Sequence, residues 1–338
     1  MRSGALLDLA NALALLLALL LAMLGGGLAG PAGGPARSGQ QRALPAHTWA
    51  ARIERAPDGT RALRDARGVL VPLRDYRRIA SSTLSADRVL ADLSEPSRIV
   101  AFSRYAAATS SGQRYADKPT LGARDGVEPV LALKPDLLLV NDLVDENFVA
   151  RLREQGIQVF DLGPMHGLST LLPAIEALGL LIGAPERAAS YGRTLERRLA
   201  RVSRDGRERA PPSALSEAPR PAPGALYLSI YGDKLFAAGA DTSYHDVVTY
   251  AGLSDVAARA GLHGWPELTG ERVLALDPEV LITRTGMGAL LCRHPGLQRS
   301  RPCRGAGRMV ELDGALLDDP GPGMLEAAEA LYDTYWLR

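Results

Sequence analysis

The chain has 338 residues, a net charge of +1 and an apolar fraction of 46%. This length accommodates two domains of ordinary size, and an apolar content this high excludes a largely disordered chain. The balance of 39 basic and 38 acidic residues gives no indication of a nucleic-acid partner.

The N-terminus has the features of an export signal. Arg2 precedes an apolar run of mainly Leu and Ala at residues 11–24, and small residues follow. This order predicts a cleaved signal peptide over residues 1–30 and a periplasmic or other extracytoplasmic location. A retained membrane anchor is the alternative, since the apolar run approaches spanning length. The Pro- and Gly-rich residues 31–47 are expected to form a flexible tether.

The next part of the chain predicts an α/β lobe over residues 48–168. It begins with short alternating stretches around turns at 57–59 and 67–68, which indicate β-hairpins. Strands and helices then alternate, as in βαβ units built on a mostly parallel sheet. The expected strands are 78–82, 98–102, 136–140 and 157–162, and the expected helices are 86–92, 129–133 and 146–155.

A helical linker over residues 169–204 separates this lobe from a second one. Its second helix, 186–204, would reach about 30 Å, enough to cross between two lobes. Residues 205–224 are Pro-rich and predict an exposed loop. A second strand and helix series over 225–338 predicts a C-terminal α/β lobe. It has expected strands at 225–230, 280–283 and 308–312 and expected helices at 247–251, 273–276 and 324–335.

A sequence repeat supports two similar lobes. Residues 128–140 (EPVLALKPDLLLV) recur as residues 271–283 (ERVLALDPEVLIT). Glu128 and Glu271 each stand at the start of a short helix in this repeat. A carboxylate there offsets the helix dipole, which accounts for one glutamate. A matched pair on two lobes favours a shared docking surface.

Ligands of open α/β sheets bind beyond the carboxyl ends of the strands, which predicts a cleft between the lobes. The candidate ligand-binding residues near those ends are Ser82, Arg104, Tyr105, Asn141, His166, Tyr231, His245, Trp265 and Arg284. Aromatic and cationic side chains together suit a large ligand that is planar or partly anionic. Trp265 either stacks on such a ligand or covers the core beneath its loop.

Known catalytic motifs are missing from the sequence. It contains no G-x-S-x-G elbow, no P-loop and no G-x-G-x-x-G after a strand, so we expect no enzymatic activity. Only His166 and His245 lie on the expected cleft loops and the sequence has no His-rich tract, so a bare divalent metal ion is the less favoured alternative. Cys292 and Cys303 are close in sequence, and in an oxidising compartment they predict a disulfide rather than a metal site.

Several segments in order carry a family resemblance. They are residues 77–93, 97–105, 126–140, 152–163, 264–283 and 294–298. The chain resembles the helical-backbone substrate-binding proteins of ABC importers, the group that captures cobalamin, ferric siderophores and haem. The resemblance implies two Rossmann-like lobes with mostly parallel sheets, joined by one long helix, with limited hinge motion and a ligand in the cleft between them. It also implies that Glu128 and Glu271 dock onto arginines of a permease dimer, and that Trp265 resembles a Trp that stacks on cobalamin. The chain departs from the family pattern at 82–87, at 105–107 and at Gly323.

The expected function is therefore that of an exported, non-catalytic, monomeric receptor that delivers a metal chelate to an ABC importer, with no covalently bound cofactor. A ferric siderophore is the first expected ligand, because Arg104 and Arg284 can pair with an anionic chelate. Cobalamin is second and haem third. A secreted hydrolase and a receptor-like sensor without a permease remain as alternatives.

Overall fold

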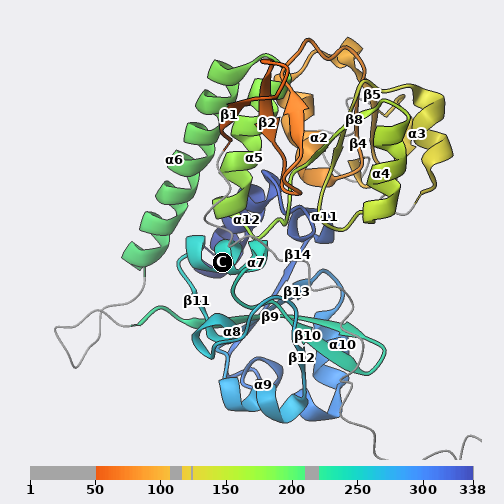
Figure 1. Cartoon of the computed structure of the whole chain (residues 1–338). Helices are drawn as coiled ribbons and strands as arrows, with labels where there is room; N and C mark the ends of the chain where they lie inside the picture. Colours follow the sequence, from red (N-terminus) through yellow and green to blue (C-terminus); the bar gives the residue numbers. More distant parts are fainter. Residues whose placement is uncertain (1–50, 107–115, 123–124, 210–220, 338) are drawn as a thin grey trace, which may run out of the picture. The chain divides into compact units, whose positions relative to one another are not determined.

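The computed structural model of the protein describes residues 51–106, 116–122, 125–209 and 221–337. The predicted signal peptide and tether lie outside these residues. The described part forms two α/β lobes joined by a long helix, which confirms the predicted fold class (Figure 1). None of the described helices combines the length and the apolar content needed to cross a lipid bilayer.

The first lobe is built on a five-stranded sheet in which all paired strands are parallel. The strands in spatial order are β6 (Thr120–Leu121), β5 (Ile99–Ser103), β4 (Ile79–Ser81), β7 (Leu137–Val140) and β8 (Gln158–Asp161). The helices are α2 (Leu84–Leu93) and α5 (Leu168–Leu181) on one face, and α3 (Val127–Leu133) and α4 (Glu146–Glu154) on the other, with a 3-10 turn at Pro96–Arg98. Every residue of β7 is buried, as expected for a parallel strand that is covered on both faces.

A separate antiparallel sheet precedes this lobe and confirms the predicted hairpins. It consists of β1 (Ile53–Arg55), β2 (Arg61–Arg64) and β3 (Leu70–Pro72). The buried carboxylate of Asp65 accepts a hydrogen bond from Arg153 Nη2 at 2.6 Å. This contact ties the small sheet to helix α4.

The second lobe has a mixed sheet. Its strands in spatial order are β12 (Glu267–Leu268), β10 (Lys234–Ala237), β9 (Gly224–Tyr231), β13 (Val280–Arg284) and β14 (Arg308–Leu312), and β11 (Ser254–Asp255) pairs with β9. Strands β9, β13 and β14 are parallel, whereas β10 and β12 are antiparallel and were not expected from the sequence. The helices are α7 (Ser243–Tyr250), α11 (Gly314–Leu317) and α12 (Gly323–Trp336) on one face, and α8 (Val256–Arg259), α9 (Gly270–Leu276) and α10 (Gly288–Arg293) on the other.

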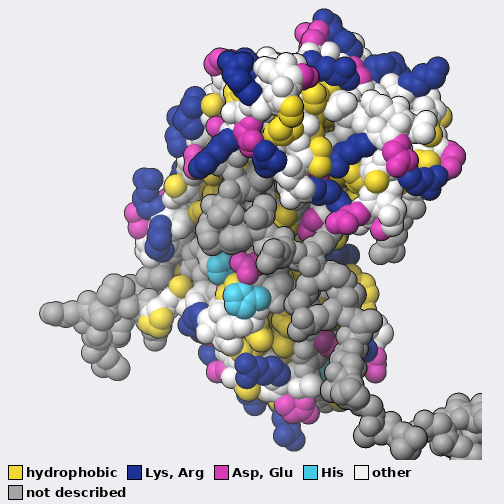
Figure 2. Space-filling model, viewed as in Figure 1, with side chains coloured by type: hydrophobic (Ala, Val, Ile, Leu, Met, Phe, Trp, Pro, Cys, Tyr) yellow, Lys and Arg dark blue, Asp and Glu magenta, His cyan; other side chains and the backbone are white. Residues whose placement is uncertain are grey.

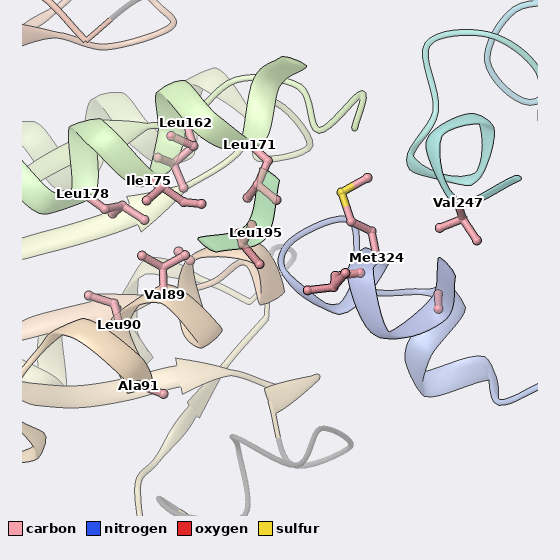
Figure 3. Packing of buried hydrophobic residues seen from close by; sticks show 14 of the residues in the cluster. Val89, Leu90, Ala91, Leu162, Leu171, Ile175, Leu178, Leu195, Val247 and Met324 are labelled. Carbon is pink, nitrogen blue, oxygen red and sulfur yellow. The ribbon is translucent and has the colours of Figure 1, made fainter. Parts of the chain in front are cut away.

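Helix α6 (Pro185–Arg209) links the lobes along one side of the described part (Figure 1). It packs against α5 of the first lobe and against α7 and α12 of the second. A single apolar core continues from one lobe to the other, with Leu90, Ile175, Leu195 and Met324 among its members (Figure 3). The lobes therefore share buried surface beside the linker helix. On the outside, Lys and Arg side chains are interspersed with Asp and Glu side chains over the face that Figure 2 shows.

The loop predicted at 205–224 is wrong at its start, because α6 continues to Arg209. Gly206 explains the difference. A Cβ at Gly206 would lie 2.8 Å from the carbonyl oxygen of Ala251, so only glycine lets the helix approach the chain after α7 this closely. Packing of the last turns thus extends the helix further than its sequence indicates.

The two cysteines form the expected disulfide. Cys292 and Cys303 are bonded, with their Cα atoms 5.3 Å apart. The bond closes a segment with two 3-10 turns, Pro295–Leu297 and Pro302–Arg304, beside α9.

Candidate functional site

A cavity of about 980 Å³ lies between the two lobes. The residues that line it are Asn141, Asp142, Leu143, Pro164, Met165, His166, Tyr227, Ser229, Tyr231, Lys234, Phe236, Asp241, Thr242, Ser243, Tyr244, His263, Gly264, Trp265, Arg284, Asp318 and Pro320. Asn141 follows β7, Tyr231 ends β9 and Arg284 ends β13. The cavity therefore occupies the carboxyl ends of parallel strands, as the sequence predicts.

Aromatic rings form one wall of this cavity. Tyr244 and Trp265 have ring centroids 4.8 Å apart in an edge-to-face arrangement, and Tyr227 lies 4.2 Å from Tyr244. Trp265 is 49% exposed and Tyr231 is 63% exposed, although both are large aromatic side chains. Exposed aromatic surface inside a cavity is available to stack on a ligand.

An ion pair occupies the same wall. Arg284 Nη2 donates to Asp318 Oδ1 at 2.6 Å, and the Tyr244 hydroxyl donates to the same oxygen at 2.9 Å. Desolvation is the largest single effect and lowers the pKa of Arg284, but Asp318, Tyr227 and Tyr244 together outweigh it and raise the pKa of the guanidinium. Across the cavity, burial raises the pKa of Asp142, and the nearby Asp161 adds to the effect. The positive charge of Arg284 is thus matched by a carboxylate within the protein.

Five of the nine predicted ligand-binding residues line this cavity, namely Asn141, His166, Tyr231, Trp265 and Arg284. Their part in ligand binding stays a prediction. Ser82, Arg104, Tyr105 and His245 do not line it.

Each of these four is placed elsewhere for a physical reason. Ser82 is buried and its hydroxyl points to the carbonyl of Leu139. Arg104 forms an ion pair with Asp125 outside the cavity lining, and the neighbouring Tyr105 is exposed. The ring of His245 is turned toward Asp255, with Nδ1 and Oδ2 2.9 Å apart.

Sequence reasoning missed His263 and Asp241 as cavity residues. His263 Nδ1 and Asp241 Oδ2 are 2.8 Å apart. Asp241 has φ of 62°, an uncommon left-handed conformation for a residue other than glycine. The position of His263 two residues before Trp265 could have drawn attention to it, but the pairing with Asp241 depends on tertiary structure. The described residues contain no group of three or more His, Cys, Asp or Glu side chains arranged to hold a metal ion.

The repeated segments have the same local structure in both lobes. Helices α3 and α9 have seven residues each, and left-handed residues follow them, Lys134 with φ of 46° and Asp277 with φ of 43°. The Glu128 side chain is 77% exposed and lies 3.9 Å from Arg151, and Glu271 is also exposed. Both carboxylates are therefore accessible to a partner.

Comparison with known proteins gives a consistent family. The pattern of the family described as periplasmic binding protein matches residues 79–301. An uncharacterised ABC transporter substrate-binding lipoprotein of Bacillus subtilis, YvrC, is 23% identical over 215 residues, which cover 62% of this chain and 65% of that protein. A cobalamin-binding protein of Halobacterium salinarum is 24% identical over 266 residues, 76% of this chain and 69% of its own.

Solved structures share the fold. A periplasmic haem-binding protein from Pseudomonas aeruginosa has a TM-score of 0.64 and 27% identity, over 78% of this chain and 93% of its own. The haem-binding protein RhuT from Roseiflexus sp. RS-1 also has a TM-score of 0.64, with 23% identity over 76% of this chain and 98% of its own. Because RhuT is only 23% identical to this chain, its similarity is evidence for the fold alone.

Proposed function

This chain belongs to the periplasmic binding protein family, and we propose that it captures a metal-centred tetrapyrrole, haem or a corrinoid, outside the cytoplasm and delivers it to an ABC importer. The observation that carries this proposal is the cavity of about 980 Å³, which has walls from both lobes and exposed aromatic rings. The flat faces of tetrapyrrole macrocycles can stack against such rings. The names of relatives that bind cobalamin and haem support the same class of ligand.

A ferric siderophore has weaker support in this geometry. That expectation rests on Arg104 and Arg284 as cations for an anionic chelate. Arg104 lies outside the cavity lining and pairs with Asp125, whereas Arg284 is already paired with Asp318 at 2.6 Å. Any anionic group, of a siderophore or of a haem propionate, would have to displace a carboxylate from Arg284, which lowers the net gain from that contact. The siderophore proposal depends on this contact, whereas the tetrapyrrole proposal depends on the aromatic rings.

The family argues against the hydrolase alternative, because its members serve transporters as binding proteins. Binding without turnover is the expected behaviour. The oxidised Cys292–Cys303 pair agrees with a location outside the cytoplasm. We further expect a monomer in solution, which size-exclusion chromatography with light scattering can test.

Titration of the purified protein tests the ligand class. Haem, hydroxocobalamin and a ferric siderophore are added separately while tryptophan fluorescence and visible absorption are recorded. We expect saturable quenching with haem or hydroxocobalamin, and recovery of the ligand unchanged. Quenching by the siderophore alone would refute the tetrapyrrole proposal.

Substitution of Glu128 and Glu271 tests the delivery step. The Glu128→Ala, Glu271→Ala double variant should keep ligand affinity and lose transport in vesicles that contain the cognate permease. A matched control removes two exposed glutamates of helix α6, Glu186→Ala with Glu196→Ala, for the same change in charge. Equal transport by the docking variant and the control would contradict the docking role.

A further inference from the structure

We infer that His263 is the side chain of the second lobe that coordinates the metal ion of the bound chelate, and that Asp241 positions its ring. This inference rests on the proposed function, because it assigns one contact within the same cavity. Both residues line the cavity, and His263 Nδ1 lies 2.8 Å from Asp241 Oδ2. The imidazole of His263 is 67% exposed, so a ligand can reach it.

The chemistry of this pair determines which nitrogen is free. An ionised carboxylate only accepts hydrogen bonds, so the hydrogen of a neutral His263 ring lies on Nδ1. The lone pair is then on Nε2, the nitrogen directed away from Asp241. Histidines that bind metals commonly donate their other N–H to a carboxylate, which orients the ring and increases its basicity.

The backbone around the pair is held in place from both sides. Ala240 and His263 form a bridge, and hydrogen bonds run from Ala240 N to Leu262 O at 2.9 Å and from Gly264 N to Ala240 O at 2.8 Å. Asp241 itself is in the left-handed region with φ of 62°. Such backbone strain outside glycine is uncommon and occurs often at functional sites.

The other candidates in the cavity are less suited to the metal. His166 Nδ1 is buried without a hydrogen-bond partner, so no carboxylate accepts a hydrogen bond from this nitrogen to orient the ring. Tyr231 must lose its proton to coordinate a metal strongly, and no described cation is hydrogen-bonded to its hydroxyl oxygen. His245 has a carboxylate partner in Asp255 but lies outside the cavity lining.

A single imidazole suits a metal ion whose other positions are already filled. The macrocycle of haem or of a corrinoid fills four positions in a plane, so a side chain would reach the metal only at an axial position, which in hydroxocobalamin means replacement of an axial group already bound there. His263 stands two residues before Trp265, whose exposed ring can stack on a macrocycle nearby. Apolar stacking and one axial bond from the same loop would then recognise both the ring and its metal.

Spectroscopy of the ferric haem complex tests this assignment in the full chain. We expect the wild-type Soret and visible bands to report a histidine ligand. His263→Ala should shift them to those of a complex without that ligand, and added imidazole should restore the wild-type bands. Asp241→Asn should keep the histidine bond but lower haem affinity by about 10-fold or more. The matched control is His245→Ala, which removes a carboxylate-paired histidine outside the cavity and should leave the bands unchanged.

The outcomes separate this inference from the proposed function. If His263→Ala binds haem with the wild-type spectrum, the inference is wrong and the tetrapyrrole proposal stands. If hydroxocobalamin binds and haem does not, the visible absorption bands of hydroxocobalamin are compared instead. An unchanged spectrum with His263→Ala would again show that the inference is wrong. If the wild-type protein binds neither, the proposed function and the inference both fall. Circular dichroism of each variant checks that it folds, and His263→Gln provides a second substitution of similar size.

Discussion

Replacing Arg88 by methionine should destabilise the protein strongly, because this arginine joins the two lobes through a buried ion cluster. Arg88 extends from α2 of the first lobe. Its Nη1 lies 3.4 Å from Asp319 Oδ2, and its Nη2 lies 2.5 Å from Glu326 Oε1 on the second lobe. Asp319 is only 1% exposed.

The magnitude follows from what the substitution leaves behind. Asp319 would keep two backbone donors, Gly321 N at 2.8 Å and Gly323 N at 3.0 Å, but lose its charged partner. Removing one member of a buried ion pair costs about 3–5 kcal/mol. Burial already raises the pKa of Asp319 to about 6, so the carboxyl group can take up a proton and limit the loss. We therefore expect the lower end, about 3 kcal/mol.

Thermal and urea unfolding measure this loss. At about 2–4 °C per kcal/mol, the expected fall in Tm for Arg88→Met is about 6–12 °C. Arg198→Met is the matched control, since Arg198 pairs with Glu329 at 2.7 Å but is 43% exposed. Exposed pairs contribute about 0–1 kcal/mol. A loss for Arg88→Met no larger than that for the control would refute the role assigned to the cluster.

Three further changes have defined outcomes. Burial raises the pKa of Asp87 from 3.8 to about 7; the stability that this group contributes is full below pH 3.8 and is lost as pH rises through about 7. Urea unfolding of the wild type should therefore show a stability loss in this window, to which Asp87 contributes up to about 1.4 kcal/mol per pH unit. Asp87→Asn should remove that contribution and leave the part that comes from Asp319, whose pKa burial also raises; an equal slope in both proteins would contradict this. The double variant Cys292→Ser, Cys303→Ser should lose about 2–4 kcal/mol of unfolding free energy, measured with guanidinium. In this variant the backbone amide hydrogens of α9 should exchange with solvent faster than those of α3. Equal exchange rates in the two helices would mean that the disulfide does not stabilise α9. Trp265→Ala should weaken tetrapyrrole binding by about tenfold in absorption titrations, and unchanged affinity would show that the ring does not stack on the ligand.

The repeated segment shows how much local sequence decides. Both copies place a glutamate at the start of a seven-residue helix. A left-handed residue and then a proline follow the helix, and a buried strand comes next in each. These choices depend on neighbours within a few positions, such as the apolar spacing of the helix and the φ restriction of proline. For the same reason the alternation of strands and helices, the linker helix and the two-lobed fold could be predicted.

The sequence alone determined the fold class, the lobe repeat and the loops from which the cavity is built, because these follow from short-range periodicity and strand ends. Only the tertiary structure decided which side chains of those loops meet. Arg104 and Arg284 have similar local contexts, yet each is paired with a carboxylate distant in sequence, Asp125 and Asp318. His245 and His263 both pair with an aspartate, and only His263 lies in the cavity. Hydrogen bonds and burial of this kind depend on where the chain returns in space, and no spacing along the sequence encodes that directly.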